Sequence, residues 1–211
     1  PEHWRDGASA TRFVTFERDG EARGYTRYRH KPDWEGGHAN HELRVGELHA
    51  LDVEAYAALS RYLFSVDLVG TVRLGNRRLN EPLRSMLVDP RRLSTRLSDT
   101  IWFRPMDVPA LLAARRYPAA GDLVIEVIDD FMGFSGGRFL LSGGPDGAEC
   151  SPTGRTPDLT MSLADLGSAY LGSPRIGQLA WVGRIDGDER AVQLAQSMFS
   201  WHIEPWCTVF F

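Results

Sequence analysis

The stretch ELRVGELHALDVEAYAALSRYLFSVDLVGTVRL (42–74) decides the fold, because it predicts a strand, a helix and a second strand in succession. Residues 42–51 place Val45 and Leu48 among polar neighbours, a pattern typical of a strand. Asp52 is a good N-cap for the helix that follows, whose apolar residues recur at helical spacing. Residues 69–74 predict a short strand, so helices and a sheet occur together in this part of the chain.

Two further strands are expected before this stretch. Residues 12–17 and 23–29 are β-prone runs on either side of Arg18-Asp19-Gly20, and Asp-Gly between such runs is a strong hairpin signal. A polar loop is expected over residues 31–40. After the stretch, Pro82 suits the first turn of a short helix over residues 81–88.

The pattern changes near Arg104–Pro105, after a predicted strand over residues 99–104, and two domains are therefore expected, over residues 1–104 and 105–211. In the second, Gly- and Pro-rich turns separate short β-prone runs, as in an antiparallel meander followed by helices. The fold class expected is α+β. The elements expected in the second domain are a helix over 108–117, strands over 122–130, 137–142, 147–151 and 158–163, and helices over 164–171, 176–182 and 188–200.

Composition excludes several classes of protein. Hydrophobic residues make up 43% and charged residues 25% of the 211 residues, values ordinary for a folded globular chain. The net charge of -4 gives no basis for nucleic-acid binding, and no apolar run is long enough to span a bilayer. Cys150 and Cys207 are too few for a disulfide scaffold, so free thiols and a cytoplasmic protein are expected.

Two motifs invite a catalytic interpretation. Gly133-Phe134-Ser135-Gly136-Gly137 matches the G-x-S-x-G nucleophile elbow, with Asp158 and His202 downstream in the order of a triad. The elbow requires a helix after the serine, whereas the residues that follow predict a strand, so a turn is expected. His38, His41 and His49 form a histidine cluster, but their spacing is not that of a zinc motif, so a solvated loop without a metal is expected.

The C-terminal aromatic residues Trp181, Phe199, Trp201 and Trp206 admit two interpretations, core packing on a helix face or the lining of an apolar pocket. Core packing is favoured. The phosphate-binding pattern [Q/R]-x-x-G-x-[G/A], whose backbone N–H groups hold a pyrophosphate at a helix N-terminus, has no match in the chain. Residues 184–189 come nearest but lack the small last residue.

Four phrases carry a resemblance: VGELHALDVEAYAALSRYLFSVDLV (45–69), LVDPRRLSTRLSDTIWFRPMDVPALLAARRY (87–117), PDLTMSLADLGSAYLG (157–172) and the final WCTVFF. In this order they resemble the Eis-type (enhanced intracellular survival) acetyltransferases of the GNAT superfamily over essentially the whole chain. The resemblance implies most of a central, degenerate GNAT-like domain over residues 1–104 and a sterol carrier protein-like domain over 105–211. It implies that the chain is the C-terminal half of such a protein, and that acetyl-CoA is bound by an N-terminal domain absent here.

The family acetylates primary amines, including aminoglycosides and protein lysines, usually as hexamers. The resemblance therefore implies a primary-amine substrate, acetyl-CoA as cofactor, a homo-oligomer, and no activity for this chain alone. In the family the main-chain carboxylate of a terminal Phe is the general base, and Phe211 stands at that position. Some members have an acidic residue before the terminal Phe, where this chain has Phe210, which makes a preference for aminoglycosides doubtful.

Two other functions remain open from the sequence. The sterol carrier-like domain could bind a lipid or another apolar ligand, or residues 105–211 could serve only oligomer contacts and closure of an active site.

Overall fold

The computed structural model describes residues 5–99 and 101–207, which form two compact units. The first contains residues 5–77 together with Trp206 and Cys207, and the second contains residues 78–205, residue 100 excepted. In the described part of the chain, no helix is both long enough and apolar enough to cross a membrane.

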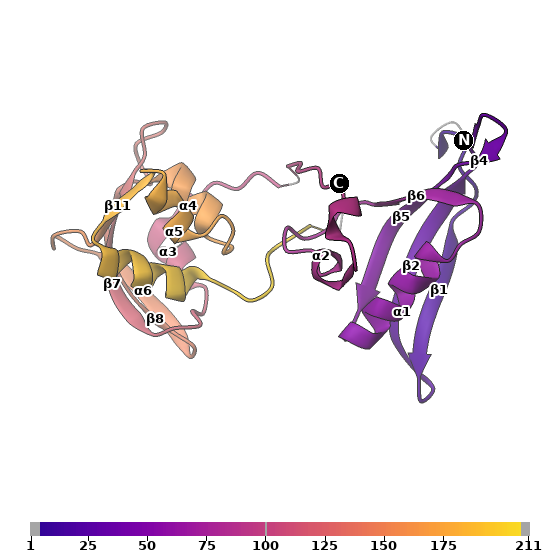
Figure 1. Cartoon of the computed structure of the whole chain (residues 1–211). Coiled ribbons are helices and arrows are strands. Elements are labelled where there is room, and N and C mark those ends of the chain that lie inside the picture. The colour runs from indigo at the N-terminus through magenta and orange to yellow at the C-terminus, as the bar shows by residue number, and fades with distance from the viewer. Residues whose placement is uncertain (1–4, 100, 208–211) are drawn as a thin grey trace. The chain divides into compact units, whose positions relative to one another are not determined.

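The first unit is a four-stranded sheet with one helix (Figure 1). Its strands are β1 (Arg12–Arg18), β2 (Glu21–Lys31), β5 (His41–Ala50) and β6 (Val69–Leu74), in the order β1-β2-β5-β6. The helix α1 (Val53–Phe64) connects β5 to β6, and such a crossover makes these two strands parallel, whereas the other pairs are antiparallel. The strand–helix–strand prediction for residues 42–74 is confirmed.

Helix α1 lies over one face of this sheet (Figure 1). It begins where predicted, because the carboxylate of Asp52 accepts a hydrogen bond from the backbone N–H of Ala55 at 2.9 Å. Leu59 and Leu63 on its inner side are buried, as are Leu43 and Leu48 on β5. Burial of this apolar layer, rather than helix propensity, fixes α1 on the sheet.

The hairpin between β1 and β2 has the two-residue turn that its sequence predicts. Asp19 and Gly20 both have positive φ, 54° and 79°, as a type I′ turn requires. A Cβ at Gly20 would contact nothing within 4 Å, so the need for glycine there is one of backbone conformation alone.

Gly20→Ala should therefore lower the stability of the chain by about 1 kcal/mol, the usual cost of left-handed backbone for a residue with a Cβ. The matched control is Gly154→Ala, which would also place its Cβ in open space but whose φ is not positive. Thermal unfolding of the two variants checks this, and equal melting temperatures would show that the turn imposes no such constraint.

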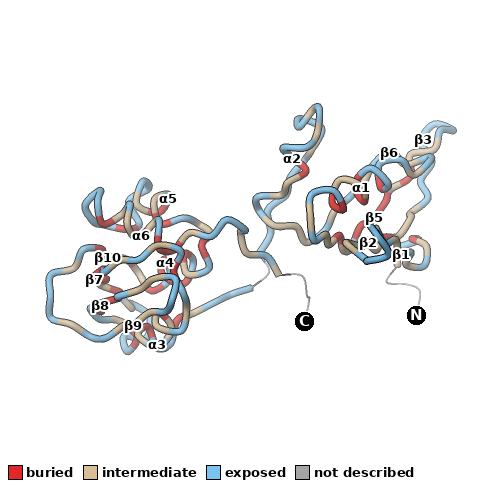
Figure 2. The backbone as a smooth tube through the Cα atoms, turned by 90° about the horizontal axis from the view of Figure 1, so that it is seen from below, coloured by how far each residue is buried: buried red, intermediate tan, exposed pale blue. Residues whose placement is uncertain are grey.

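The second unit is a five-stranded sheet in the order β11-β10-β7-β8-β9, packed with short helices (Figure 1). Burial follows the inner faces of these elements, as Figure 2 shows for β7, β8 and β10. The elements are α2 (Leu83–Met86), a 3-10 helix (Pro90–Arg92), α3 (Val108–Ala113), β7 (Gly121–Ile128), β8 (Gly137–Gly144), β9 (Gly147–Pro152), β10 (Leu159–Ser162), α4 (Leu163–Ala169), α5 (Ile176–Trp181), β11 (Ile185–Gly187) and α6 (Glu189–Phe199).

The predicted meander is correct for β7, β8 and β9 but wrong for β10, which pairs with β7 in parallel. A contact between residues distant in sequence accompanies this pairing: the side chain of Asp158 accepts from the backbone N–H of Val124 at 2.7 Å, and Asp158 donates its own N–H to the carbonyl of Val124. Strand β11 was not predicted. It adds three residues at the edge, antiparallel to β10.

Three other expectations are corrected. The described residues of 99–104 are not a strand, and Trp102 within them is 88% exposed. The helix predicted over 81–88 is only the single turn α2, with Pro82 before it as the N-cap residue. The polar loop at 31–40 contains a small hairpin, β3 (Trp34–Glu35) with β4 (His38–Ala39).

Candidate functional site

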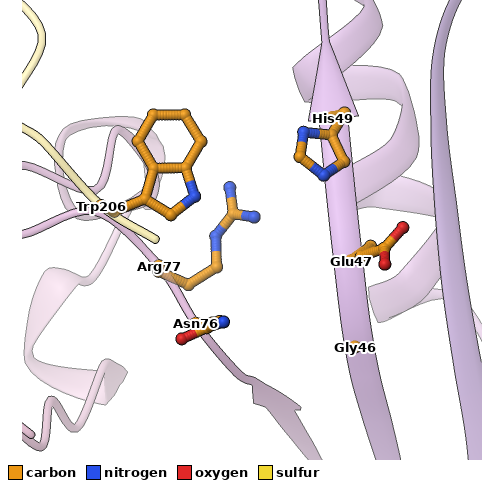
Figure 3. A pocket seen from close by; sticks show the side chains of 6 residues that line it. All are labelled: Gly46, Glu47, His49, Asn76, Arg77 and Trp206. Carbon is orange, nitrogen blue, oxygen red and sulfur yellow. The ribbon is translucent and has the colours of Figure 1, made fainter. Parts of the chain in front are cut away.

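The one catalytic residue predicted from the sequence, Phe211, lies outside the described residues. The described chain nearest to it is Trp206-Cys207, and Trp206 packs within the first unit rather than the second. Its indole lines a shallow hollow together with Gly46, Glu47, His49, Asn76 and Arg77 (Figure 3). This hollow is the candidate functional site, because it fixes the position of the chain five residues before Phe211.

The hollow forms where the parallel strands β5 and β6 separate. Their pairing ends at Val45 and Leu74, with a last hydrogen bond from the N–H of Gly75 to the carbonyl of Val45 at 3.0 Å. Gly46 is an extra residue in the register between β5 and β2, and such a bulge bends a strand. A glycine within a predicted strand is a sequence signal for a bulge, so this feature could have been found from the sequence.

Arg77 occupies the space between the diverging strands. Its Nη1 donates to the carbonyl of Leu48 at 2.8 Å. In Figure 3 its guanidinium lies between the indole of Trp206 and the imidazole of His49. The Arg77 side chain thus provides a hydrogen bond to the backbone of β5 where β5 no longer pairs with β6. It also places a flat cationic group beside the indole.

Glu47 is already engaged on the far side of the hollow. One of its carboxylate oxygens lies 2.8 Å from Nη2 of Arg27, and the other accepts from the hydroxyl of Tyr25 at 2.8 Å. This hydrogen bond, with a smaller effect of burial, raises the pKa of Tyr25. The Tyr25 ring packs against His49 with 5.3 Å between ring centroids. Glu47 therefore serves as a structural anchor, and the hollow contains no nucleophile paired with a free base.

The N-terminus of α1 is the place in this unit where a pyrophosphate could be bound by backbone N–H groups. Asp52 occupies it, and the next acidic residue, Glu54, lies in the first turn. Arg23 and Arg18 contact the Asp52 carboxylate at 3.0 and 3.2 Å, and Arg18 also contacts Glu54 at 2.6 Å. The hydrogen bond from Ala55 and then that from Arg23 lower the pKa of Asp52, so this helix end carries a fixed anion. A phosphate group would have to displace the Asp52 side chain from the N–H of Ala55.

The G-x-S-x-G segment is a turn, as predicted. It leads directly into strand β8, and the buried Ser135 donates its hydroxyl to the carbonyl of Met106 at 2.8 Å. Asp158 is held by Val124, and His202 is exposed beside Trp201. The three residues of the hypothetical triad are thus engaged separately, and the serine hydrolase interpretation is not supported.

The histidines and aromatic residues differ in part from expectation. His38 is exposed, but His41 is buried on the inner face of β5, so the solvated-loop prediction is wrong for it. The described residues contain no group of three or more His, Cys, Asp or Glu side chains that could bind a metal. Core packing is confirmed for Phe199, which is 2% exposed, and wrong for Trp181, which is 90% exposed.

Each of the two parts of the chain matches a known protein family. A family described as acetyltransferase (GNAT) domain matches residues 1–105, and one described as sterol carrier protein domain matches residues 108–208. These matches do not support the expectations that residues 1–104 are only a partial GNAT-like domain, that the chain is the C-terminal half of such a protein, and that the acetyl-CoA-binding domain is absent from it. They equally give no support to the expectation that the chain alone is inactive, which stays a prediction.

The sequence similarity to individual proteins covers most of the chain. An uncharacterized N-acetyltransferase of Streptomyces avermitilis is 43% identical over 98% of the chain and 51% of that protein. The N-acetyltransferase Eis of Mycobacterium tuberculosis is 37% identical over 67% of the chain and 35% of that protein. The crystal structure of Eis1 from Mycobacterium abscessus superposes with a TM-score of 0.74 at 34% identity, over 89% of the chain and 48% of that structure.

A GCN5-related N-acetyltransferase from Anabaena variabilis, at 22% identity and a TM-score of 0.72, shows a similar fold over 98% of the chain and 52% of that structure. The chain spans about half the length of the curated relatives it matches. The chain is thus similar to Eis and other N-acetyltransferases, with residues 1–105 matching the acetyltransferase (GNAT) domain family and residues 108–208 the sterol carrier protein domain family.

Proposed function

We propose that this chain takes part in the transfer of an acetyl group from acetyl-CoA to a primary amine, with the α-carboxylate of Phe211 as general base. The observation that carries the proposal is the position of Trp206, which holds the chain on the GNAT unit shortly before that carboxylate. The similarity to N-acetyltransferases supports the reaction class.

The chemistry requires such a base. An ammonium group has no lone pair, so the amine must lose a proton before it attacks the thioester carbonyl. The attack forms the amide and releases the coenzyme as its thiol. An α-carboxylate has an ordinary pKa of about 3.5 and is therefore ionised at neutral pH. Residues near the C-terminus would also form part of the wall of the amine pocket.

We further propose that the coenzyme phosphates bind elsewhere than at α1. The Asp52 carboxylate already accepts the N–H of Ala55 at that helix end, so a pyrophosphate would have to displace it. We also propose that the protein forms a homo-oligomer and is located in the cytoplasm. The boundary between its two domains is proposed to lie near Arg104.

The test of the reaction class is an assay of coenzyme thiol release by a protein that contains this chain and extends to the length of its relatives. Lysine peptides and aminoglycosides serve as acceptors. We expect thiol release that depends on a primary amine, with weak use of aminoglycosides because Phe210 adds no acidic group. Thiol release that is the same without any amine would contradict the proposal.

A second candidate function, binding of an apolar ligand, is favoured by the match to a sterol carrier protein domain. The interior of the second unit is nonetheless well filled. Its sheet and helices share one layer of buried side chains, and Tyr117 packs edge-on against Phe199 with 5.3 Å between ring centroids. The hydroxyl of Tyr117 also donates to the carbonyl of Leu112 at 2.8 Å, which ties this layer to α3.

We therefore expect no lipid to copurify with the 211-residue chain. Native mass spectrometry checks this, because a retained fatty acid or sterol adds a discrete mass that disappears on denaturation. A stoichiometric adduct of that kind would favour the apolar-ligand function over a purely packed domain.

A further inference from the structure

Two imidazoles meet on the inner face of the first sheet. His30 on β2 and His41 on β5 are joined by a hydrogen bond of 2.8 Å between Nε2 of His30 and Nδ1 of His41. The rings stand edge to face, with 4.6 Å between centroids. His41 is only 6% exposed, whereas His30 is partly exposed.

The second nitrogen of His41 has no hydrogen bond. Its Nε2 is buried and is without a partner among the described residues. On this side of the pair lies the small hairpin of β3 and β4, which contributes Trp34. The indole of Trp34 meets the His41 ring edge-on, with 5.4 Å between centroids, and is itself 63% exposed. The hairpin thus covers a polar group that nothing in the described structure satisfies.

The hairpin itself is held by few contacts. Only two residue pairs join β3 to β4, across a turn in which Gly36 and Gly37 both have positive φ. The N–H of Asn40 donates to the carbonyl of Asp33 at 3.0 Å, and its side chain donates to Glu35 at 3.3 Å. A hairpin this short has little stability of its own. The packing of Trp34 on His41 therefore contributes to the stability of its closed position.

No carboxylate is hydrogen-bonded to either imidazole among the described residues, so a positive charge on the pair would lack compensation. Burial, then the neighbouring His41 and Arg12, lowers the pKa of His30. Charged and titratable groups on the surrounding elements include Arg12 on β1, Tyr28, Arg29 and Lys31 on β2, Glu42 and Arg44 on β5, Tyr62 on α1, Asp33 before the hairpin, and Glu35 and His38 within it.

Three of these groups have partners of their own. The hydroxyls of Tyr28 and Tyr62 are hydrogen-bonded at 2.7 Å, and Glu42 is paired with Arg44 at 2.6 Å. These three side chains are therefore engaged away from the histidine pair.

We propose that the His30–His41 pair is a proton-operated latch for the hairpin over residues 34–39. When the pair is neutral, one hydrogen is shared between the rings and Trp34 packs on His41. When both rings are protonated, each nitrogen carries a hydrogen, the bond between the rings is lost, and two like charges face each other at close range. The hairpin then opens and admits water to both rings.

The pKa of His30 is lowered by burial in the closed hairpin, so the closed state binds fewer protons than the open one and its stability rises with pH. It declines as the pH falls below the ordinary histidine pKa of about 6.5.

Hydrogen–deuterium exchange of the 211-residue chain between pH 7.5 and 5.0, corrected for the intrinsic pH dependence, tests the latch. We expect protection of residues 33–40 to fall more than twofold as the pH is lowered, because the open hairpin binds more protons than the closed one. Protection of β7 in the second unit should not change. Constant protection of the hairpin, or equal loss in β7, would overturn the proposal.

Two variants isolate the pair. In His30→Gln an amide that does not titrate can replace the hydrogen bond to His41, and the pH response of the hairpin should fall below twofold. His38→Gln removes an exposed histidine from the hairpin itself and should leave the full response. The same response in all three proteins would contradict the latch. If His30→Gln fails to fold, the wild-type series and His38→Gln still decide the question.

Discussion

Appending one residue after Phe211 is expected to lower the turnover of an active protein containing this chain by about 10²- to 10⁴-fold, the usual contribution of a general base. The added residue converts the Phe211 carboxylate into a neutral amide and moves the new carboxylate by about 3.5 Å. A base must lie within hydrogen-bond reach of the proton it removes, so this displacement suffices to disable it. The melting temperature should stay the same.

The control for this experiment is Phe211→Leu, which keeps the carboxylate in place and alters only the side chain. It should cost far less turnover than the extension. If the tail merely packed in a core, the order would reverse: the substitution would lower the melting temperature and the extension would be tolerated. Full activity of the extended protein would end the assignment of the carboxylate as base.

Trp206→Ala should lower turnover by about 10- to 100-fold, since displacement of a catalytic group by as little as 1 Å can cost about 100-fold. Trp206 lines the hollow formed by the diverging strands β5 and β6, beside Arg77 and His49. Removing the indole frees the chain that leads to Phe211. The indole is 38% exposed, so its loss should change the stability of the unit only slightly.

Trp181→Ala is the matched control, because that indole is 90% exposed and lies in the second unit. It should leave both turnover and melting temperature unchanged. Steady-state kinetics on the two variants decide the matter, and equal turnover would show that Trp206 does not position the C-terminal segment.

Local chemistry explains which elements could be predicted from the sequence. The Asp19-Gly20 turn and the Asp52 cap each depend on residues adjacent in the chain, and both occur as expected. The parallel pairing of β10 with β7 depends on a contact between Asp158 and Val124, far apart in sequence. No local pattern specifies such a contact, so an antiparallel meander was the default expectation.

Helical and strand periodicity would have corrected two residue-level errors. In α5 the buried residues Ile176 and Leu179 are three apart, and Trp181 falls off that stripe onto the exposed side. On β5, His41 shares the inward face with Leu43 and Val45, which alternate with it along the strand. The assignment of His41 to a loop came from its glycine-rich neighbours rather than from this alternation.

The site itself was only partly predictable. The sequence pointed to the C-terminal carboxylate through a family resemblance, and the glycine at position 46 within a predicted strand could have indicated the bulge there. It gave no sign that Arg77 would reach back to the carbonyl of Leu48, since that contact arises from the separation of β5 and β6 in three dimensions. Nor did it show that Trp206 would pack with the first unit.

The role of the GNAT domain in this chain is tested most directly by calorimetric titration of acetyl-CoA into the 211-residue chain. The Asp52 side chain already caps the N-terminus of α1, and the sequence contains no match to the phosphate-binding pattern of GNAT enzymes. We expect no heat beyond that of dilution. A saturable site with micromolar affinity would contradict the prediction that this chain does not bind acetyl-CoA. It would show that residues 1–105 form a coenzyme-binding GNAT domain.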